Sequence, residues 1–245
     1  MPCSPLTDVH DFGGTVSVDF VYGKCGGRWI FRKTEKEDAS FPTAEQRYRN
    51  EAAALKLLAE RTSIPVPKLI YCGPDDNGKW CLETEFLSPT MQAATAADIC
   101  RMPHQHRPSQ SNNAFCKHCD AIVRGNVAHF IQNTVLPQLH GLRASSTGIE
   151  GVVIPPPWVF RTRPAPEGGW TSKASQSQEY VFCHNDLHEL NILVDIYTLK
   201  VCALIDWEYS GFFPAPIQHW HYDYNKWKKM FDNKEIIDRD AQLLS

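Results

Sequence analysis

Side chains of the types used in phosphoryl transfer gather in two short segments of the C-terminal third. Asp186 and Asn191 lie in the sequence HNDLHELN, and Asp206 follows the apolar run CALI. A carboxylate can orient an attacking hydroxyl and accept its proton, and amide and carboxylate oxygens are ligands that Mg²⁺ prefers. These residue types predict three catalytic residues, with Asp186 as the base and Asn191 and Asp206 as the magnesium ligands.

The spacing of these residues supports the same chemistry. Asp186 and Asn191 are five residues apart, and Asp206 comes fifteen residues after Asn191. This order matches H-x-D-x-x-x-x-N, the pattern of a kinase catalytic loop, followed by a metal-binding aspartate. Apolar residues on both sides predict short strands, so we expect the polar residues on a loop held by a rigid frame. His184 is expected to bond nearby backbone and hold that loop; a merely structural turn is the alternative.

The N-terminal third must supply the elements that face this loop. Segments 15–23 and 29–34 alternate in polarity and are rich in β-formers, so they predict a hairpin. Thr43 is a candidate cap for a helix running to about residue 61, whose sequence favours a helix with one apolar stripe. Two further strands are expected at 68–72 and 79–87, separated by the turn PDDNG.

After Pro89 the sequence pattern changes from one typical of strands to one typical of helices and loops. Apolar residues over 113–141 are spaced for one face of a long helix. Residues 144–178 are rich in Ser, Pro and Gly and predict a loop. The tail after Pro216 is aromatic and basic at first and is expected to end in a short helix.

The composition limits the partners and the compartment. The 245 residues carry a net charge of −3 and a pI of about 6.4, so no basic field exists to bind nucleic acid. The sequence has no stretch of about 18 apolar residues, so no membrane partner is expected. Residues 1–12 lack the features of a signal peptide. The nine scattered cysteines are therefore expected as reduced thiols in a cytoplasmic protein. The sequence carries no signal for an oligomeric state.

The segments VFCHNDLHELNILVD and LIDWEYSGFFP resemble the aminoglycoside phosphotransferase family, most of all its fungal kinase-like members, and are similar to choline and ethanolamine kinases. The resemblance covers about residues 13–215. It implies an α+β, two-lobed protein-kinase-like fold, with a small antiparallel-sheet N-lobe at 1–87 that binds nucleotide. The mainly helical C-lobe at 88–245 would carry the catalytic loop and the acceptor site. ATP and Mg²⁺ are the implied cofactors, and a small molecule with a hydroxyl group is the implied acceptor.

The resemblance also assigns residues of the N-lobe. RWIFRK is similar to the strand with the family's phosphate-binding basic residue, which falls on Arg32; Lys33, which points to the opposite strand face, is the alternative. Glu51, in the next helix, would pair with that basic residue, and a surface charge pair is the other interpretation. The glycine turn that would cover the phosphates is limited to 13–14.

A further family position falls on the connection between the lobes, and one more residue of the expected catalytic loop has a possible role. CLETEFLSP resembles the hinge, where the backbone from Glu85 to Leu87 would meet adenine. His188 lies two residues after the expected base, so it could approach the transferred phosphate; a solvent-facing loop histidine is the alternative.

Departures from the family pattern keep a second function open. The hinge segment FLSPTMQ lacks the expected glycine, and little chain follows Asp206. A catalytically weak or inactive kinase-like protein that binds nucleotide or a partner is therefore the alternative to a phosphotransferase. Choline-like amines, sugars and secondary metabolites are all compatible acceptors, because fold and catalytic loop do not determine the acceptor.

Three other groups have a functional and a structural interpretation. Trp207, Glu208 and Tyr209 are expected to pack and shape the loop after Asp206. A C-x-x-C motif lies in a cysteine and histidine group that could form half of a zinc site, but helix core plus loop is favoured. The aromatic residues of the tail could line a pocket for a cationic acceptor, but packing is favoured. The cysteine and histidine group consists of Cys100, His104, His106, Cys116, His118 and Cys119. The aromatic group consists of Trp220, Tyr222, Tyr224 and Trp227.

Overall fold

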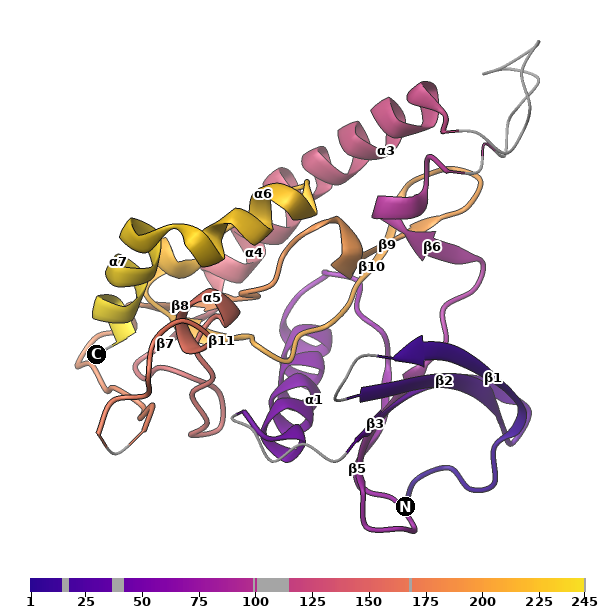
Figure 1. The fold of residues 1–245 in the computed structure, drawn as a ribbon, viewed down its shortest axis with the longest axis horizontal. Helices are drawn as coiled ribbons and strands as arrows, with labels where there is room; N and C mark the ends of the chain where they lie inside the picture. The colour runs from indigo at the N-terminus through magenta and orange to yellow at the C-terminus, as the bar shows by residue number, and fades with distance from the viewer. Residues whose placement is uncertain (15–17, 37–41, 99, 101–114, 168, 245) are drawn as a thin grey trace.

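The computed structural model describes residues 1–14, 18–36, 42–98, 100, 115–167 and 169–244. Figure 1 shows a twisted sheet near the N-terminus and a mainly helical part that contains β8 to β11 and the C-terminus. The expected α+β class is confirmed. Among the described helices, none is long and apolar enough to cross a membrane.

The N-terminal sheet has five antiparallel strands in the order β1-β2-β3-β5-β4. The expected hairpin forms from β2 and β3, whose turn has left-handed glycines at 26 and 27, a conformation that glycine adopts without steric cost. β1 was not expected, because its Asp, His and Gly residues mask a strand pattern. The five strands are β1 (Thr7–Gly14), β2 (Val18–Cys25), β3 (Arg28–Glu35), β4 (Leu69–Pro74) and β5 (Trp80–Glu85).

Helix α1 (Ala44–Arg61) packs on this sheet and begins where the sequence predicted. Thr43 and Gln46 form a capping box: the Gln46 N–H donates to Thr43 Oγ1 at 3.3 Å, and the Thr43 N–H donates to Gln46 Oε1 at 3.0 Å. One side of α1 buries Tyr48 and Ala52 against Leu82 of β5. Other residues of the helix join the large core of the C-terminal part, so α1 connects both parts of the molecule.

The long helix expected at 113–141 forms as three consecutive helical segments in the described part of that range. They are α3 (Lys117–Phe130), a π-helical turn at Ile131–Val135 and α4 (Leu136–Gly141). One face of this helix is buried in the large core, through Cys119, Val123, Val127, Ile131 and Val135. The helix therefore shares one core with Leu187 and Ile192 of the segment that runs from β8 into β9.

Two small antiparallel sheets frame the catalytic segments, in the orders β10-β9-β6 and β11-β8-β7. The first contains β6 (Thr90–Gln92), β9 (Ile192–Asp195) and β10 (Val201–Leu204), and the second contains β7 (Arg143–Ala144), β8 (Tyr180–Cys183) and β11 (Gly211–Phe213). Short helices cover the second sheet around a separate core that includes Trp158 and Trp227. They are α5 (Pro157–Phe160), α6 (Tyr224–Lys228) and α7 (Lys234–Leu244). The 3₁₀ turn η4 (Ala215–Ile217) follows β11, and η5 (Lys229–Asp232) joins α6 to α7.

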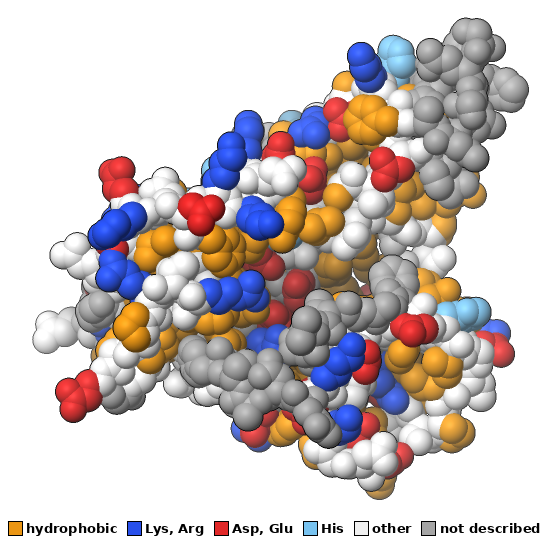
Figure 2. Space-filling model, viewed as in Figure 1, with side chains coloured by type: hydrophobic (Ala, Val, Ile, Leu, Met, Phe, Trp, Pro, Cys, Tyr) orange, Lys and Arg blue, Asp and Glu red, His pale blue; other side chains and the backbone are white. Residues whose placement is uncertain are grey.

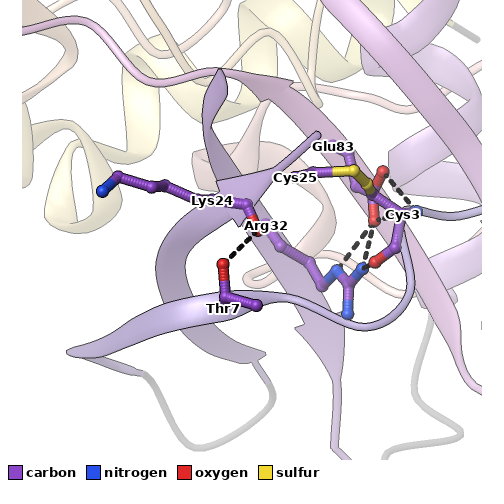
Figure 3. Close-up of a disulfide and its surroundings, with 6 residues drawn as sticks. All are labelled: Cys3, Thr7, Lys24, Cys25, Arg32 and Glu83. Atoms are coloured by element: carbon purple, nitrogen blue, oxygen red, sulfur yellow. Dashed lines mark hydrogen bonds and ion pairs between the residues drawn. A yellow bond between two sulfur atoms is a disulfide. The ribbon is translucent and has the colours of Figure 1, made fainter. Parts of the chain in front are cut away.

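A disulfide between Cys3 and Cys25 ties the N-terminus to the β2–β3 turn (Figure 3). Beside it, the fully buried Glu83 accepts hydrogen bonds from the Cys3 N–H at 3.1 Å and from Arg32 Nε at 2.9 Å. Arg32 also donates to the Cys3 carbonyl. The expectation of reduced thiols is therefore wrong for this pair, because folding brings together two cysteines that are distant in sequence.

Candidate active site

The expected catalytic loop connects β8 to β9 and includes the turn η3 (Glu189–Asn191). Asp186 is 7% exposed, and its carboxylate lies against the side chain of Asn191. Asn191 Nδ2 donates to the Asp186 carbonyl at 2.8 Å and to Asp186 Oδ2 at 2.9 Å. These two bonds fix the amide so that its NH₂ group faces Asp186, and the opposite end of the amide is the oxygen that a cation would need.

His184 holds the loop, as expected. Its Nδ1 accepts the Asp186 N–H at 3.2 Å, and its Nε2 lies 3.1 Å from the Ile205 carbonyl. Burial lowers the pKa of His184 to about 4, so the ring is neutral at pH 7. Because Nδ1 acts as an acceptor, the proton belongs on Nε2, which donates to Ile205. One buried imidazole thereby connects the segment of Asp186 to the segment of Asp206.

His188 contacts the expected base directly. Its Nδ1 accepts the Leu190 N–H at 3.3 Å, so Nε2 carries the proton and donates to Asp186 Oδ1 at 3.2 Å. The ring is 4% exposed and packs against Tyr224 and Trp227, with centroid distances of 5.0 and 4.7 Å. The alternative of a solvent-facing histidine is therefore wrong, and the geometry is that of a residue that orients Asp186.

Asp206 follows β10 and has a left-handed backbone with φ 65°. The N–H of its neighbour Ile205 donates to the Asn191 carbonyl at 3.0 Å, so the backbone segments that carry the two expected magnesium ligands are hydrogen-bonded to each other. Asp206 Oδ1 accepts from Lys33 Nζ at 2.7 Å. Burial raises the pKa of Asp206, but the Lys33 ammonium outweighs this and holds it below the ordinary value, so Asp206 is a carboxylate at pH 7.

The expected pair of Arg32 with Glu51 does not form. Lys33 Nζ lies 2.8 Å from Glu51 Oε2, whereas Arg32 faces the opposite side of the sheet and binds Glu83. The sheet register explains the difference, because adjacent residues of a strand point to opposite faces and only the face of Lys33 lies against α1. The alternative stated from the sequence, Lys33, occupies the basic position of this site.

Buried charges surround Lys33. Carboxylate oxygens of Glu51, Asp206 and Glu208 all lie within 4.8 Å of one another. Burial would lower the pKa of Lys33, but Asp206 and Glu51 raise it well above its usual value, so the ammonium stays charged. Burial raises the pKa of Glu208 to about 7, with a further contribution from Asp206. The cluster therefore contains one ammonium ion that stays charged and three carboxyl groups. Ionising all three carboxyl groups at once would cost free energy, because the buried charges repel one another.

The segment that connects the two parts has a defined backbone arrangement. The Glu85 N–H donates to the Lys68 carbonyl at 2.9 Å, and the Leu87 carbonyl accepts from Thr90 Oγ1 at 2.8 Å. Phe86 donates its N–H to the Trp29 carbonyl at 3.2 Å. Glu85 is thus the last residue of β5, in the same sheet as Lys33, and Leu87 lies two residues beyond the end of that strand.

Buried amides that sequence reasoning missed also hold the site. Asn50 Nδ2 donates to the carbonyls of Glu208 at 3.1 Å and Ser210 at 2.7 Å, although Asn50 is 1% exposed on a helix. Asn185 Nδ2 donates to the Tyr209 carbonyl at 2.9 Å. Both amides fix the segment after Asp206. The sequence signal was a polar residue next to each assigned one, Asn50 beside Glu51 and Asn185 beside Asp186.

The side chains expected to pack do so. Trp207 is fully buried in the large core, and Tyr209 is 5% exposed. Trp227 belongs to the core around α6 and α7, and Tyr224 packs against it. Figure 2 shows the region between the N-terminal sheet and α6 as a recess with acidic side chains inside. His104 and His106 of the cysteine and histidine group lie outside the described residues.

The protein has a two-lobed protein-kinase-like fold, as expected. One lobe is the five-stranded sheet with α1, and the other is the mainly helical part. Lys33, Glu51 and Asp206 meet between the two lobes. Residues 157–215 match the family model described as "Phosphotransferase enzyme family". The matched segment contains Asp186, Asn191 and Asp206. The resemblance stated from the sequence is thereby confirmed.

Solved structures of aminoglycoside phosphotransferases are similar to the chain. Aminoglycoside-3'-phosphotransferase of type VIII is 20% identical, with a TM-score of 0.49, over 99% of this chain and 93% of that one. A thermostable mutant of aminoglycoside phosphotransferase APH(4)-Ia, in ternary complex with AMP-PNP and hygromycin B, is 12% identical, with a TM-score of 0.47, over 84% of this chain and 68% of that one. A search of curated proteins found no match.

Proposed function

We propose that the protein is an ATP-dependent phosphotransferase that moves the γ-phosphate to a hydroxyl group of a small molecule. The single observation that carries the proposal is the ion-pair chain from Glu51 through Lys33 to Asp206, which joins the N-terminal sheet to the catalytic segments. A lysine held by a helix glutamate beside a metal-binding aspartate is what phosphate positioning in a kinase requires.

The nucleotide would lie between an N-lobe at 1–87 and a C-lobe at 88–245. The backbone at Glu85 and Leu87 would meet the adenine, and Lys33, positioned by Glu51, would bind the phosphates. In this proposal Lys33 replaces Arg32, because Arg32 is engaged by the buried Glu83. The bound Lys33 would contribute electrostatic stabilisation as charge shifts toward the leaving phosphate oxygens.

The magnesium site would consist of Asn191 and Asp206. The residues fit the ion, because Asp206 is a carboxylate at pH 7 and Asn191 directs its NH₂ group to Asp186, which leaves the amide oxygen as the donor. When bound, Mg²⁺ neutralises charge on the phosphate oxygens. The protein's own contribution is to hold these two donors beside each other through the bond from the Ile205 N–H to the Asn191 carbonyl.

Asp186 would act on the acceptor. Its Oδ2 accepts from Asn191 and its Oδ1 from His188, so two donors fix the plane of the carboxylate. The carboxylate would orient the acceptor hydroxyl and take its proton as the oxygen attacks phosphorus. His188 would position this base rather than contact the phosphate, which differs from the role suggested by its place in the sequence.

The direct test is an acceptor screen. Purified protein is incubated with Mg-ATP and a panel of amino alcohols, sugars and aminoglycosides, and products are analysed by mass spectrometry. The proposal predicts at least one acceptor that gains one phosphoryl group while ADP forms in equal amount. A thermal shift with Mg-ATP but no transfer to any acceptor would instead favour the catalytically inactive, nucleotide-binding alternative.

A further inference from the structure

Three cysteines outside the active site meet in the core of the C-terminal part. Cys100, Cys116 and Cys119 are 3%, 1% and 2% exposed. Their sulfur atoms all lie within 4.8 Å of one another, and the Sγ atoms of Cys119 and Cys100 are 3.7 Å apart. Packing alone explains one buried cysteine, but it does not require three sulfur atoms at one point.

The local backbone brings these sulfur atoms together. Cys116 is the N-cap of α3 and Cys119 lies in its first turn, so the C-x-x-C motif turns both side chains to the same side of the helix. The Cys116 N–H donates to the Ala97 carbonyl at 2.7 Å, which fastens the start of α3 to the segment that ends at Cys100. The arrangement resembles one half of a zinc site plus a third ligand from a neighbouring segment.

The distances fit a tetrahedral ion. With zinc–sulfur bonds of about 2.3 Å, two thiolates of a regular tetrahedron lie about 3.8 Å apart. The separation of 3.7 Å between Cys100 and Cys119 agrees with this value. It is far longer than a disulfide bond of about 2.05 Å. Thiolates favour soft or borderline ions such as Zn²⁺ over Mg²⁺, so this site would not compete for the ion of the active site.

We propose that Cys100, Cys116 and Cys119 are ligands of a structural zinc site. The site lies apart from the catalytic centre but acts on its support. Gln92, at the end of β6, donates Nε2–H to the Leu190 carbonyl of the catalytic loop at 2.9 Å. The ion would fasten the chain that follows β6 to α3 and so keep this contact in place.

Proton release is an expected property of the site. Zinc binds thiolates, so each ligand must lose its proton on binding. The affinity for zinc should therefore rise with pH.

The test begins with the metal content of the full-length chain. Protein purified in reductant, with and without added zinc, is dialysed and analysed by elemental analysis and native mass spectrometry. The proposal predicts about one zinc per chain. Replacement by Co²⁺ should give thiolate charge-transfer bands and the intense d–d bands of a tetrahedral site. Absence of zinc from protein that has been exposed to it would overturn the proposal.

Single variants locate the ligands. Cys100→Ser, Cys116→Ser and Cys119→Ser should each weaken zinc binding by at least about tenfold. Cys72→Ser and Cys202→Ser, which alter half-buried cysteines elsewhere, are the matched controls and should retain full zinc content. Unchanged zinc affinity in all three ligand variants would contradict the assignment.

A measurement on the wild type covers the case in which the variants do not fold. Cysteine alkylation, followed by peptide mass spectrometry, should show that zinc slows the modification of Cys100, Cys116 and Cys119 without changing that of Cys202. Equal rates with and without zinc would overturn the proposal. A disulfide between any two of the three cysteines in protein purified without reductant, with no metal bound, would also overturn it and indicate a redox pair.

Discussion

The ammonium of Lys33 lies 2.7 Å from the carboxylate of Asp206, although 173 residues separate them in sequence. Lys33 belongs to β3 and Asp206 follows β10, so this contact joins the N-terminal sheet to the catalytic segments. The same ammonium binds Glu51 of α1 at 2.8 Å. Through one side chain, three elements from both parts of the molecule meet where the phosphates of a nucleotide would lie.

The two neighbouring basic residues should respond differently to substitution. Lys33→Met should lower kcat/KM by about 10²–10³-fold, because it removes an electrostatic donor to the phosphates. Arg32→Met should leave the turnover of folded protein within a few-fold but lower the free energy of unfolding by about 3 kcal/mol, because it leaves Glu83 buried without its partner. Steady-state kinetics and urea unfolding of both variants check this. Loss of turnover in Arg32→Met with retention in Lys33→Met would reverse the assignment.

Glu208 should make the protein less stable at alkaline pH. Its pKa is about 7 in the folded protein against an ordinary value of 4.5, so the folded state holds a proton that the unfolded state has released. Stability is then lost as pH rises from 4.5 through 7, by on the order of 3 kcal/mol. Glu208→Gln should remove most of this loss, because a glutamine side chain does not titrate. The hydrogen bond from Asn50 should be kept, since it goes to the backbone carbonyl of residue 208.

Urea unfolding at pH 5 and pH 8 measures this effect. His184 acts in the opposite direction, because its folded pKa of about 4 lies below the ordinary 6.5 and stability is lost as pH falls through that range. This contribution is common to wild type and Glu208→Gln, so the difference between them isolates Glu208. Identical pH dependence of the two proteins would show that Glu208 is ionised in both states.

His188 should affect turnover more than nucleotide binding. His188→Leu removes the donor to Asp186 Oδ1, so the base loses its fixed orientation and kcat should fall by up to about 10²-fold, with KM for ATP little changed. His188→Gln keeps an N–H donor and should retain more activity than His188→Leu. Comparing kcat and KM in both variants distinguishes a positioning role from a phosphate contact. If KM for ATP rises while kcat is unchanged, His188 binds the nucleotide.

The disulfide should contribute measurably to stability in oxidised protein. Closing a loop with a sequence separation of 22 residues stabilises the folded state by about 3 kcal/mol in the chain-entropy model. Reductant should therefore lower the Tm of wild-type protein, and Cys3→Ser/Cys25→Ser should have the lower Tm with or without reductant. Cys202→Ser, as control, should keep the response of the wild type. A wild-type Tm insensitive to reductant would contradict this.

The loop that carries Asp186 and Asn191 could be predicted from sequence because the pattern that specifies it is local. Asp186 and Asn191 are five residues apart, and short apolar strands on either side leave few arrangements for the loop. The capped helix after Thr43 was predictable for the same reason. Asp206 could be added because the residue types and the order of the two segments repeat a known pattern.

Contacts between distant segments could not be predicted in this way. The choice between Arg32 and Lys33 depends on which face of β3 lies against α1, and both faces of that strand carry a charged residue. Cys3 and Cys25 pair only because β1 folds back along β2. Cys100 reaches the C-x-x-C motif through a backbone contact between Ala97 and Cys116 that no sequence pattern indicates.

The central claim is that Asp186 is the base of a phosphoryl transfer, and Asp186→Asn tests it most directly. With an acceptor from the screen, the variant should bind Mg-ATP with an affinity close to that of the wild type in calorimetry, while turnover falls by about 10²–10⁴-fold. Unchanged turnover in a folded Asp186→Asn protein would contradict the account.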